Sequence, residues 1–360
     1  MDFTFSEQQT AFRDAVSRFL MTEAAPETLR EIWETDAGRS PQLRAALASH
    51  GLTRMSVAEK YGGLGCDDVD WALITQELGY YCIPDSLADT ACVAVGLLGG
   101  LDNDVQMASD WLALVVGGSV RIAVGHPINS LVADAHMADL LLLHHAGEIH
   151  ALARASVDVR LNPSIDQSRR LCRVSWIPTA ATRVADAVCG EALWAEALNR
   201  GALCVAGQLI GLAQRMLDLS VDYARQRKQF GRPIGSFQVI KHYLSDLVTK
   251  IEFAKPVLYR AAYALSNRQA DADVLVSHAK LACGAAAWSA ARHGLQVHGA
   301  TGYTWETDLQ MFMKRAWALD ASWGDRGFHK ARVAQFVLED GAMLSPGNIA
   351  DLRMFEGELN

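Results

Sequence analysis

The residues best suited to binding a charged ligand lie in the run 223–242, which reads Y-A-R-Q-R-K-Q-F-G-R-P-I-G-S-F-Q-V-I-K-H. Arg227, Gln229 and Phe230 fall close together within it. The guanidinium of Arg227 carries a planar fork of donors that can hold phosphate oxygens in pairs. The alternative is that Arg227 is a solvated residue at a helix end and Phe230 a core aromatic.

A second candidate segment, 296–303, reads Q-V-H-G-A-T-G-Y. Gly299 and Gly302 permit close approach of the backbone to a ligand, because glycine has no Cβ. A G-x-x-G pattern is weak by itself. The pattern alone assigns no binding role to Gln296 and Gly299, which lie at the end of an alanine-rich helical pattern.

Metal-ligand patterns are missing from the sequence. The histidines at 144, 145, 298 and 329 have no ligand partner at the required spacing, and the seven cysteines are scattered without a C-x-x-C pair. This cysteine usage argues against a disulfide framework or a zinc site. We expect reduced thiols and no metal.

Composition favours an ordinary globular protein. The 360 residues are 50% hydrophobic and 21% charged, which is enough for two or three domains with large cores. A net charge of −8 gives no general attraction for nucleic acid or an anionic membrane. The N-terminus lacks a basic and apolar leader, and no run of about 18 apolar residues occurs, so a cytoplasmic location is expected.

The elements that position the candidate segments follow a helical, β, helical order. Residues 1–111 are predicted as a helical domain, with a capping box formed by Ser6 and Gln9 and with helices at 42–50 and 67–81. Short runs rich in branched residues predict a β domain over 112–188. Its expected strands are 112–116, 120–124, 140–144, 149–153 and 171–176, with a hairpin loop at 145–147.

Helical periodicity returns over 189–345. Apolar residues spaced three and four apart place one face of a long helix toward a core; they are Val205, Leu209, Leu212, Met216, Leu219 and Tyr223. A second helix follows the loop 231–235 and is kinked or ended at Pro256. Further helices at 273–297 and from about 308 predict a four-helix bundle, followed by a tail at 346–360. The fold class is mostly α with a small β domain.

Four landmarks, in the same order along nearly the whole chain, resemble the acyl-CoA dehydrogenase family. They are the opening 1–9, Y-G-G-L-G at 61–65 with E-L-G at 77–79, R-x-Q-F-G-x-P-I at 227–234, and the segment 296–303. The resemblance implies an N-terminal helical domain, a middle β domain and a C-terminal four-helix bundle that enclose FAD and an acyl-CoA thioester. In the family, a carboxylate removes the α proton while the β hydrogen leaves as hydride to the flavin.

The resemblance also assigns roles to both candidate segments. Arg227, Gln229 and Phe230 correspond to residues that cross a dimer interface to the pyrophosphate and adenine of the neighbouring subunit's FAD. Gln296 and Gly299 correspond to residues that contact the same cofactor.

The catalytic base departs from the family pattern. Many members carry a glutamate about 27 residues after the glutamine that matches Gln296, and this count reaches Trp323. Other members place it at the start of the first bundle helix, near Gly201. Glu196 lies five residues from Gly201, while Asp320 and Asp325 flank Trp323; these carboxylates are fallback bases that we interpret as surface or helix-end charges.

The β region departs as well. It contains no segment like the family's T-E-P-x-x-G-S-D, and Trp176-Ile177-Pro178 resembles a strand leaving the domain more than the family's flavin-contact motif. The family motifs that are present are those that contact the FAD of a neighbouring subunit. The motifs that are missing are those that form the chain's own active site. This selective loss resembles the non-catalytic subunit of the α2β2 acyl-CoA dehydrogenases of bacterial steroid side-chain degradation.

The resulting hypothesis is a subunit that shares FAD with a second, glutamate-bearing acyl-CoA dehydrogenase subunit acting on acyl-CoA. An electron-transfer flavoprotein is a candidate acceptor. One alternative is an active homo-oligomeric enzyme that uses Asp325 or Glu196 as its base. Another is a non-enzymatic relative, such as a nucleic-acid-binding one, for which the sequence offers only local basic clusters.

Overall fold

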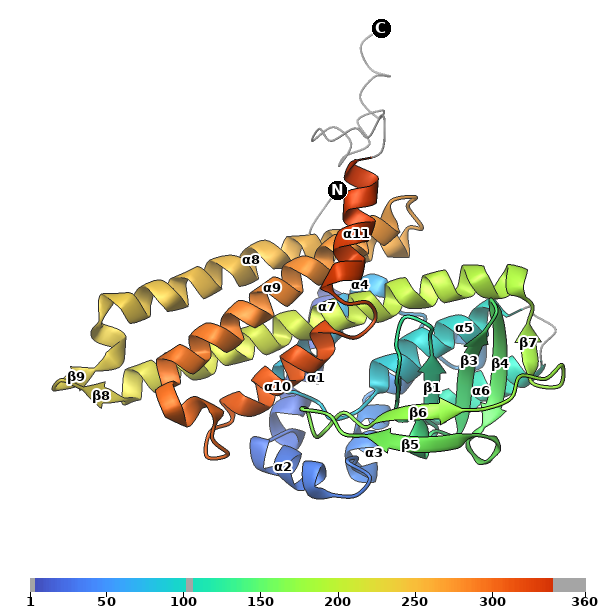
Figure 1. Ribbon diagram of the computed structural model, residues 1–360, viewed down its shortest axis with the longest axis horizontal. Coiled ribbons are helices and arrows are strands. Elements are labelled where there is room, and N and C mark those ends of the chain that lie inside the picture. The colour runs from blue at the N-terminus through green and yellow to red at the C-terminus, as the bar shows by residue number, and fades with distance from the viewer. Residues whose placement is uncertain (1–3, 102–105, 339–360) are drawn as a thin grey trace, which may run out of the picture.

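The computed structural model describes residues 4–101 and 106–338, and Figure 1 shows helices packed beside a small β region and a long bundle. The predicted fold class is confirmed, since helical, β and helical regions follow one another in that order. The predicted tail at 346–360 and the last residues of the bundle range lie outside the described residues.

The N-terminal region consists of short helices. They are α1 (Glu7–Glu23), α2 (Pro26–Glu34), α3 (Pro41–Ser49), α4 (Asp68–Tyr80), the π-helix η3 (Asp89–Ala94), α5 (Val95–Gly100) and α6 (Gln106–Gly117). The capping box at α1 is confirmed, because the Gln9 N–H donates to Ser6 Oγ and the Ser6 N–H donates to Gln9 Oε1, both at 3.1 Å. The helices predicted at 42–50 and 67–81 are confirmed as α3 and α4, whereas α2 was not predicted.

The strand predicted at 112–116 is wrong, because these residues belong to α6. A short apolar run cannot be assigned to strand or helix by periodicity alone. Leu112 and Val115 lie three residues apart and are both buried, so they share one helical face. The first strand, β1 (Ile122–Gly125), begins only after the turn at Gly118.

Two small sheets form the β region. One has the order β1-β3-β4-β7 and the other the order β2-β6-β5. The further strands are β2 (Val132–Ala133), β3 (Leu140–His145), β4 (Glu148–Ala153), β5 (Asp158–Asn162), β6 (Leu171–Ser175) and β7 (Arg183–Ala185). The predicted hairpin is confirmed, since β3 and β4 are antiparallel and Ala146 and Gly147 both have positive φ, as a two-residue type I′ turn requires. Sequence reasoning missed β2, β5 and β7.

The bundle is built on α7 (Ala187–Gln226), a helix of 40 residues. It is completed by α8 (Gln238–Ser266), α9 (Ala272–His298), α10 (Leu309–Asp320) and α11 (Arg326–Val337). α8 continues through Pro256, so the helix does not end there; the buried residues Leu258 and Ala261 anchor the continuation. Within the described residues, α7 is long and apolar enough to cross a membrane, but 72% of its most apolar window is buried in the protein.

The crossing of α4 and α7 requires glycine. A Cβ on Gly211 would lie 1.9 Å from the carbonyl oxygen of Gln76, and one on Gly79 would lie 2.1 Å from that of Gln208. We expect Gly211→Ala to lower the free energy of unfolding by about 2 kcal/mol, because the helices must separate. Gly99→Ala is the control: it lies in α5 with no atom within 4 Å of its Cβ, so a gain of about 0.5–1 kcal/mol is expected. Urea denaturation measures both, and equal effects would contradict the close crossing.

Candidate cofactor and active sites

A tight hairpin follows α7 and presents the first candidate segment. Its strands are β8 (Lys228–Gln229) and β9 (Arg232–Pro233), joined by a turn at Phe230 and Gly231 with φ of 51° and 78°. The left-handed conformation costs a non-glycine residue roughly 1 kcal/mol or more. Phe230 is nevertheless 91% exposed, so the alternative that it is a core aromatic is wrong.

The hairpin carries exposed polar side chains that are available to bind a ligand. Arg227 and Gln229 are exposed, and the Arg227 guanidinium makes no hydrogen bond or ion pair within residues 4–101 and 106–338. Arg225, two positions earlier, instead lies 3.9 Å from Asp222. α8 starts directly after the hairpin, and no side chain caps its N-terminus. Free N–H groups at a helix N-terminus favour anions.

The second candidate segment lies at the same end of the bundle. α9 ends at His298, whose ring stacks on Tyr223 of α7 with centroids 4.3 Å apart. Gly299 has φ 65° and ψ −146°, a conformation that suits only glycine, and a Cβ there would meet no atom within 4 Å. Gln296 is exposed. The structure therefore brings the two segments together at the hairpin end of the bundle (Figure 1).

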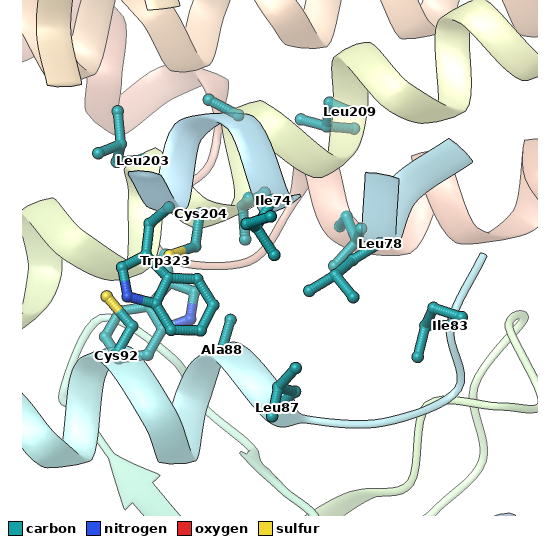
Figure 2. Packing of buried hydrophobic residues seen from close by; sticks show 14 of the residues in the cluster. Ile74, Leu78, Ile83, Leu87, Ala88, Cys92, Leu203, Cys204, Leu209 and Trp323 are labelled. Carbon is teal, nitrogen blue, oxygen red and sulfur yellow. The ribbon is translucent and has the colours of Figure 1, made fainter. Parts of the chain in front are cut away.

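The two positions where the family resemblance places a glutamate adjoin each other. A Cβ on Gly201 would lie 2.2 Å from Cδ2 of Trp323, so the indole ring fills the space beside α7. Trp323 is only 4% exposed, and its Nε1 donates to Asp89 Oδ1 at 3.2 Å. Figure 2 shows the ring between Cys92 of η3 and Cys204 of α7.

The loop that carries Trp323 is held in a strained conformation. Trp323 has φ 55°, and its N–H donates to Asn129 Oδ1 at 2.8 Å. Its carbonyl oxygen is 2.9 Å from His329 Nε2, and Lys280 Nζ donates to the Asp320 carbonyl at 2.8 Å. Burial lowers the pKa of Lys280 to about 8. Such strain persists only where the surroundings fix it, as these contacts do.

His329 makes the stability of this loop depend on pH. Burial, reinforced by Lys280, lowers the pKa of His329 to about 4, below its usual 6.5. Between these values only the unfolded state is protonated, so the contribution of His329 to stability is complete above pH 6.5 and falls as the pH decreases. We expect the stability difference between the native chain and His329→Gln to shrink by about 2 kcal/mol from pH 7 to pH 5.

Urea denaturation at both pH values measures this difference. The comparison between variants is necessary because burial raises the pKa of Asp89 to about 6, which acts in the opposite direction over the same range. His278, exposed on α9, is the control, and His278→Gln should leave the pH dependence unchanged. A His329→Gln difference that stays constant with pH would contradict a neutral, buried His329.

The fallback carboxylates are engaged elsewhere. Asp325 caps α11 by accepting from the Phe328 N–H at 2.8 Å. Asp320 accepts from Trp288 Nε1 at 2.8 Å and from Arg326 Nε at 2.7 Å. Glu196 lies 3.3 Å from Arg200 at a groove of about 630 Å³, which Trp323 does not line.

Among the described residues, no ring contact joins Trp176 to the bundle. Trp176 comes just after β6 ends, and its ring lies 5.0 Å from that of His150 on β4 of the other sheet, while Ile177 is exposed. The predicted interpretation of 176–178 as a strand leaving the domain therefore fits the position of these residues.

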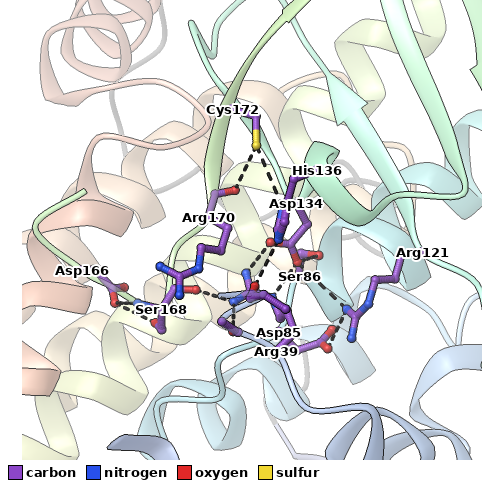
Figure 3. A network of polar contacts seen from close by, with 12 residues as sticks. Arg39, Asp85, Ser86, Arg121, Asp134, His136, Asp166, Ser168, Arg170 and Cys172 are labelled. Carbon is purple, nitrogen blue, oxygen red and sulfur yellow. Dashed lines mark hydrogen bonds and ion pairs between the residues drawn. The ribbon is translucent and has the colours of Figure 1, made fainter. Parts of the chain in front are cut away.

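A buried network of charges joins the three regions, and sequence reasoning missed it. Figure 3 shows its centre, where Arg39 Nε donates to Asp134 Oδ2 at 2.8 Å. Burial alone would raise the pKa of Asp134, but Arg39, Ser86 and Arg121 together outweigh burial and the pKa is lowered. Arg315 of α10 pairs with Asp166 in the β5–β6 loop. No spacing in the sequence links these residues, so only the fold reveals the network.

The network surrounds a cavity of about 50 Å³ between the three regions. Its lining residues include Asp89, Gln208 and Trp323. Pockets that bury drug-sized ligands typically measure about 300–1,000 Å³. This cavity is therefore too small for a group as large as a flavin ring.

Comparison with known proteins places the chain in a family. Residues 6–99 match the acyl-CoA dehydrogenase N-terminal domain, and residues 190–338 match the acyl-CoA dehydrogenase C-terminal domain. Acyl-CoA dehydrogenase IpdE2 of Mycobacterium tuberculosis is 30% identical over 311 residues, covering 86% of this chain and 91% of the relative.

Solved structures show the same fold. The ChsE4-ChsE5 complex from Mycobacterium tuberculosis gives a TM-score of 0.82 at 20% identity and covers 94% of this chain and 99% of that chain. The Tcur3481-Tcur3483 steroid ACAD gives 0.83 at 20% identity, with the same two coverages of 94% and 99%. The chain thus belongs to the acyl-CoA dehydrogenase family, whose members are FAD-binding oxidoreductases acting on acyl-CoA.

Proposed function

We propose that this chain is a subunit of an FAD-dependent acyl-CoA dehydrogenase that completes the FAD site of a glutamate-bearing partner subunit and has no base of its own. One contrast carries the proposal. The hairpin with Arg227 and Phe230 is exposed and uncommitted, whereas the indole of Trp323 fills the space beside Gly201.

The residues at the hairpin end fit one edge of a bound FAD. Arg227 would hold pyrophosphate oxygens, with the uncapped N-terminus of α8 adding positive potential. Phe230 and Gln229 would contact the adenine, and the open backbone at Gly299 would admit close approach beside Gln296. When bound, FAD accepts the hydride from the β carbon of the acyl-CoA.

Two observations support the proposal that this chain has no catalytic base of its own. Trp323 and Gly201 offer no proton acceptor at the positions that the family uses, and the nearby acid Asp325 is spent on capping α11. A general base must also reach the proton that it removes. The cavity between the three regions measures about 50 Å³, so a substrate and a flavin ring would not fit there beside a catalytic base.

The comparisons support the proposed class of partner. The ChsE4-ChsE5 neighbour is named as a complex, and the Tcur3481-Tcur3483 neighbour is named as a steroid ACAD. We assign this chain to an α2β2 heterotetramer in the cytoplasm, acting on a steroid side-chain CoA. An electron-transfer flavoprotein would accept the electrons, as the relative named as a subunit of a caffeyl-CoA reductase-Etf complex illustrates.

The test is flavin stoichiometry. The chain is purified alone and after co-expression with a glutamate-bearing acyl-CoA dehydrogenase subunit, and flavin absorbance is divided by protein concentration. We expect little flavin alone and one flavin for each pair of chains in the complex. Stoichiometric flavin in an isolated, active chain would refute the proposal.

The alternative of an active homo-oligomer has its own test. Asp325→Asn and Glu196→Gln are made in the isolated chain and assayed for desaturation of acyl-CoA. The alternative requires turnover by the isolated chain and its loss in one of these variants. Without turnover in the unmodified chain, the alternative is excluded.

A further inference from the structure

The interdomain cavity differs from the rest of the core in its charge. It has room for roughly four waters or one small oxyanion, on the basis of about 10–15 Å³ for each water. Six arginines and four aspartates line it or pair with the lining residues. The ion pairs are Arg39–Asp134, Arg44–Asp85, Arg121–Asp85, Arg315–Asp166 and, at 4.0 Å, Arg121–Asp134.

Two of the six arginines, which are adjacent in sequence, take no part in these ion pairs. Within the described ranges, neither Arg169 nor Arg170 has a carboxylate within ion-pair distance. Arg170 donates through Nη2 to the carbonyls of Trp33 and Thr35, and its buried Nε has no hydrogen-bond partner in the described part of the chain. Arg170 is half-buried, so its charge is partly solvated. Arg169 therefore brings to the cavity wall a positive charge that has no carboxylate at ion-pair distance among the described residues, and charge buried without a partner is costly.

Arg169 has the donors to hold an anion. Its Nη1 donates to the Ala318 carbonyl at 3.3 Å and to Ser322 Oγ, which fixes the side chain against α10. Its Nε and Nη2 make no hydrogen bond to the residues that the structure describes. Burial lowers the pKa of Arg169, and the nearby charges of Asp89 and Asp166 oppose this shift without cancelling it.

Asp89 is the one carboxylate of the wall without an ion pair among the described residues. Its Oδ1 accepts from Trp323 Nε1, which leaves Oδ2 free of any such hydrogen bond. Arg169 is the cation with the largest effect on it, although the two form no ion pair. A ligand between them must therefore accept from a guanidinium and donate to a carboxylate.

We propose that this cavity binds a small oxyanion that keeps a proton, with inorganic phosphate as the simplest case. Arg169 donates to the unprotonated oxygens, and Asp89 accepts from the remaining O–H. Sulfate has the same shape and no O–H at neutral pH, so Asp89 would repel it. The site lies between the three regions, away from the hairpin end that carries Arg227, and is independent of the proposed FAD sharing.

The experiment is calorimetric titration of the full chain with inorganic phosphate and with sulfate, in a chloride buffer at constant ionic strength. We expect saturable binding of phosphate and at least tenfold weaker binding of sulfate. Arg169→Gln should weaken phosphate binding at least tenfold. Asp89→Asn keeps an acceptor for Trp323 and should remove the preference for phosphate over sulfate.

The control is Arg160→Gln, which replaces an exposed arginine of β5 that lies 3.3 Å from Asp158. It should bind phosphate as the native chain does. If Arg169→Gln fails to fold, the altered selectivity of Asp89→Asn still decides the matter. A native chain that shows no saturable phosphate binding, equal response to the two anions, or the same loss in Arg160→Gln would overturn the proposal and leave a water-filled cavity.

Discussion

Arg227→Ala is expected to weaken FAD binding by the complex with a glutamate-bearing partner about 100-fold, equivalent to about 3 kcal/mol. The guanidinium is exposed and uncommitted in this chain, so its removal leaves the fold intact. The loss comes from charge-assisted hydrogen bonds to the pyrophosphate, which are among the strongest in proteins. Fluorescence titration of the deflavinated complex with FAD measures it.

Arg225→Ala is the matched control, because Arg225 is also exposed, lies two residues away and is close to Asp222. FAD affinity should remain within a factor of about two, since a screened surface charge contributes little. Equal losses of FAD affinity in the two variants would indicate that any positive charge in this region attracts FAD, without a specific contact from Arg227. If Arg227→Ala loses no FAD affinity, the Arg227 side chain does not bind the cofactor.

Trp323→Ala is expected to lower the free energy of unfolding by about 3–5 kcal/mol, the usual range for a buried aromatic. The indole is packed against α7 at Gly201 and donates to Asp89, so truncation leaves a cavity and an unpaired acceptor. Trp305→Ala, which removes a half-exposed tryptophan, should cost less than about 1 kcal/mol. Guanidinium denaturation compares the two.

A third variant tests the backbone strain at the same position. Trp323→Gly loses the same ring as Trp323→Ala but relaxes the left-handed backbone, so it should be more stable than Trp323→Ala by roughly 1 kcal/mol. If the alanine variant is the more stable one, the loop is not strained. A loss below about 1 kcal/mol in both variants would show that the ring does not fill the site.

Local signals were enough to predict much of the fold. Ser6 and Gln9 satisfy each other's N–H groups through chain neighbours only, so the start of α1 could be predicted without tertiary information. The turn at Ala146 and Gly147 is local in the same sense. α7 is readable because residues such as Leu209 and Met216 repeat at helical spacing for many turns. The family resemblance, which rests on four ordered landmarks, is confirmed.

The errors lie where tertiary contacts decide. Residues 112–116 are apolar in either conformation, and burial against neighbouring helices selects the helix. Pro256 breaks one hydrogen bond, but packing of α8 along α9 outweighs that loss. Strands as short as β2 and β7 carry too few residues to show an alternation.

The candidate sites divide in the same way. Residue types and the resemblance singled out Arg227 and Gln296, but their common location depends on the Tyr223–His298 stack, which no local pattern encodes. Counting along the sequence reached Trp323 and Gly201 separately, and only the fold shows their contact. The roles of these residues toward FAD and substrate stay predictions. The network around Arg39 and Asp134 joins residues far apart in sequence and had no signal at all.

The length of α7 has a mechanical consequence. Gly201 lies within α7 and Arg227 directly follows its last residue, so the two stand roughly 40 Å apart at about 1.5 Å per residue. α7 is buried along most of this length, so its packing holds the hairpin at a fixed distance from the core around Gly201. Accumulated substitutions around Gly201 could therefore abolish one activity while the distant end kept the shape that another protein depends on.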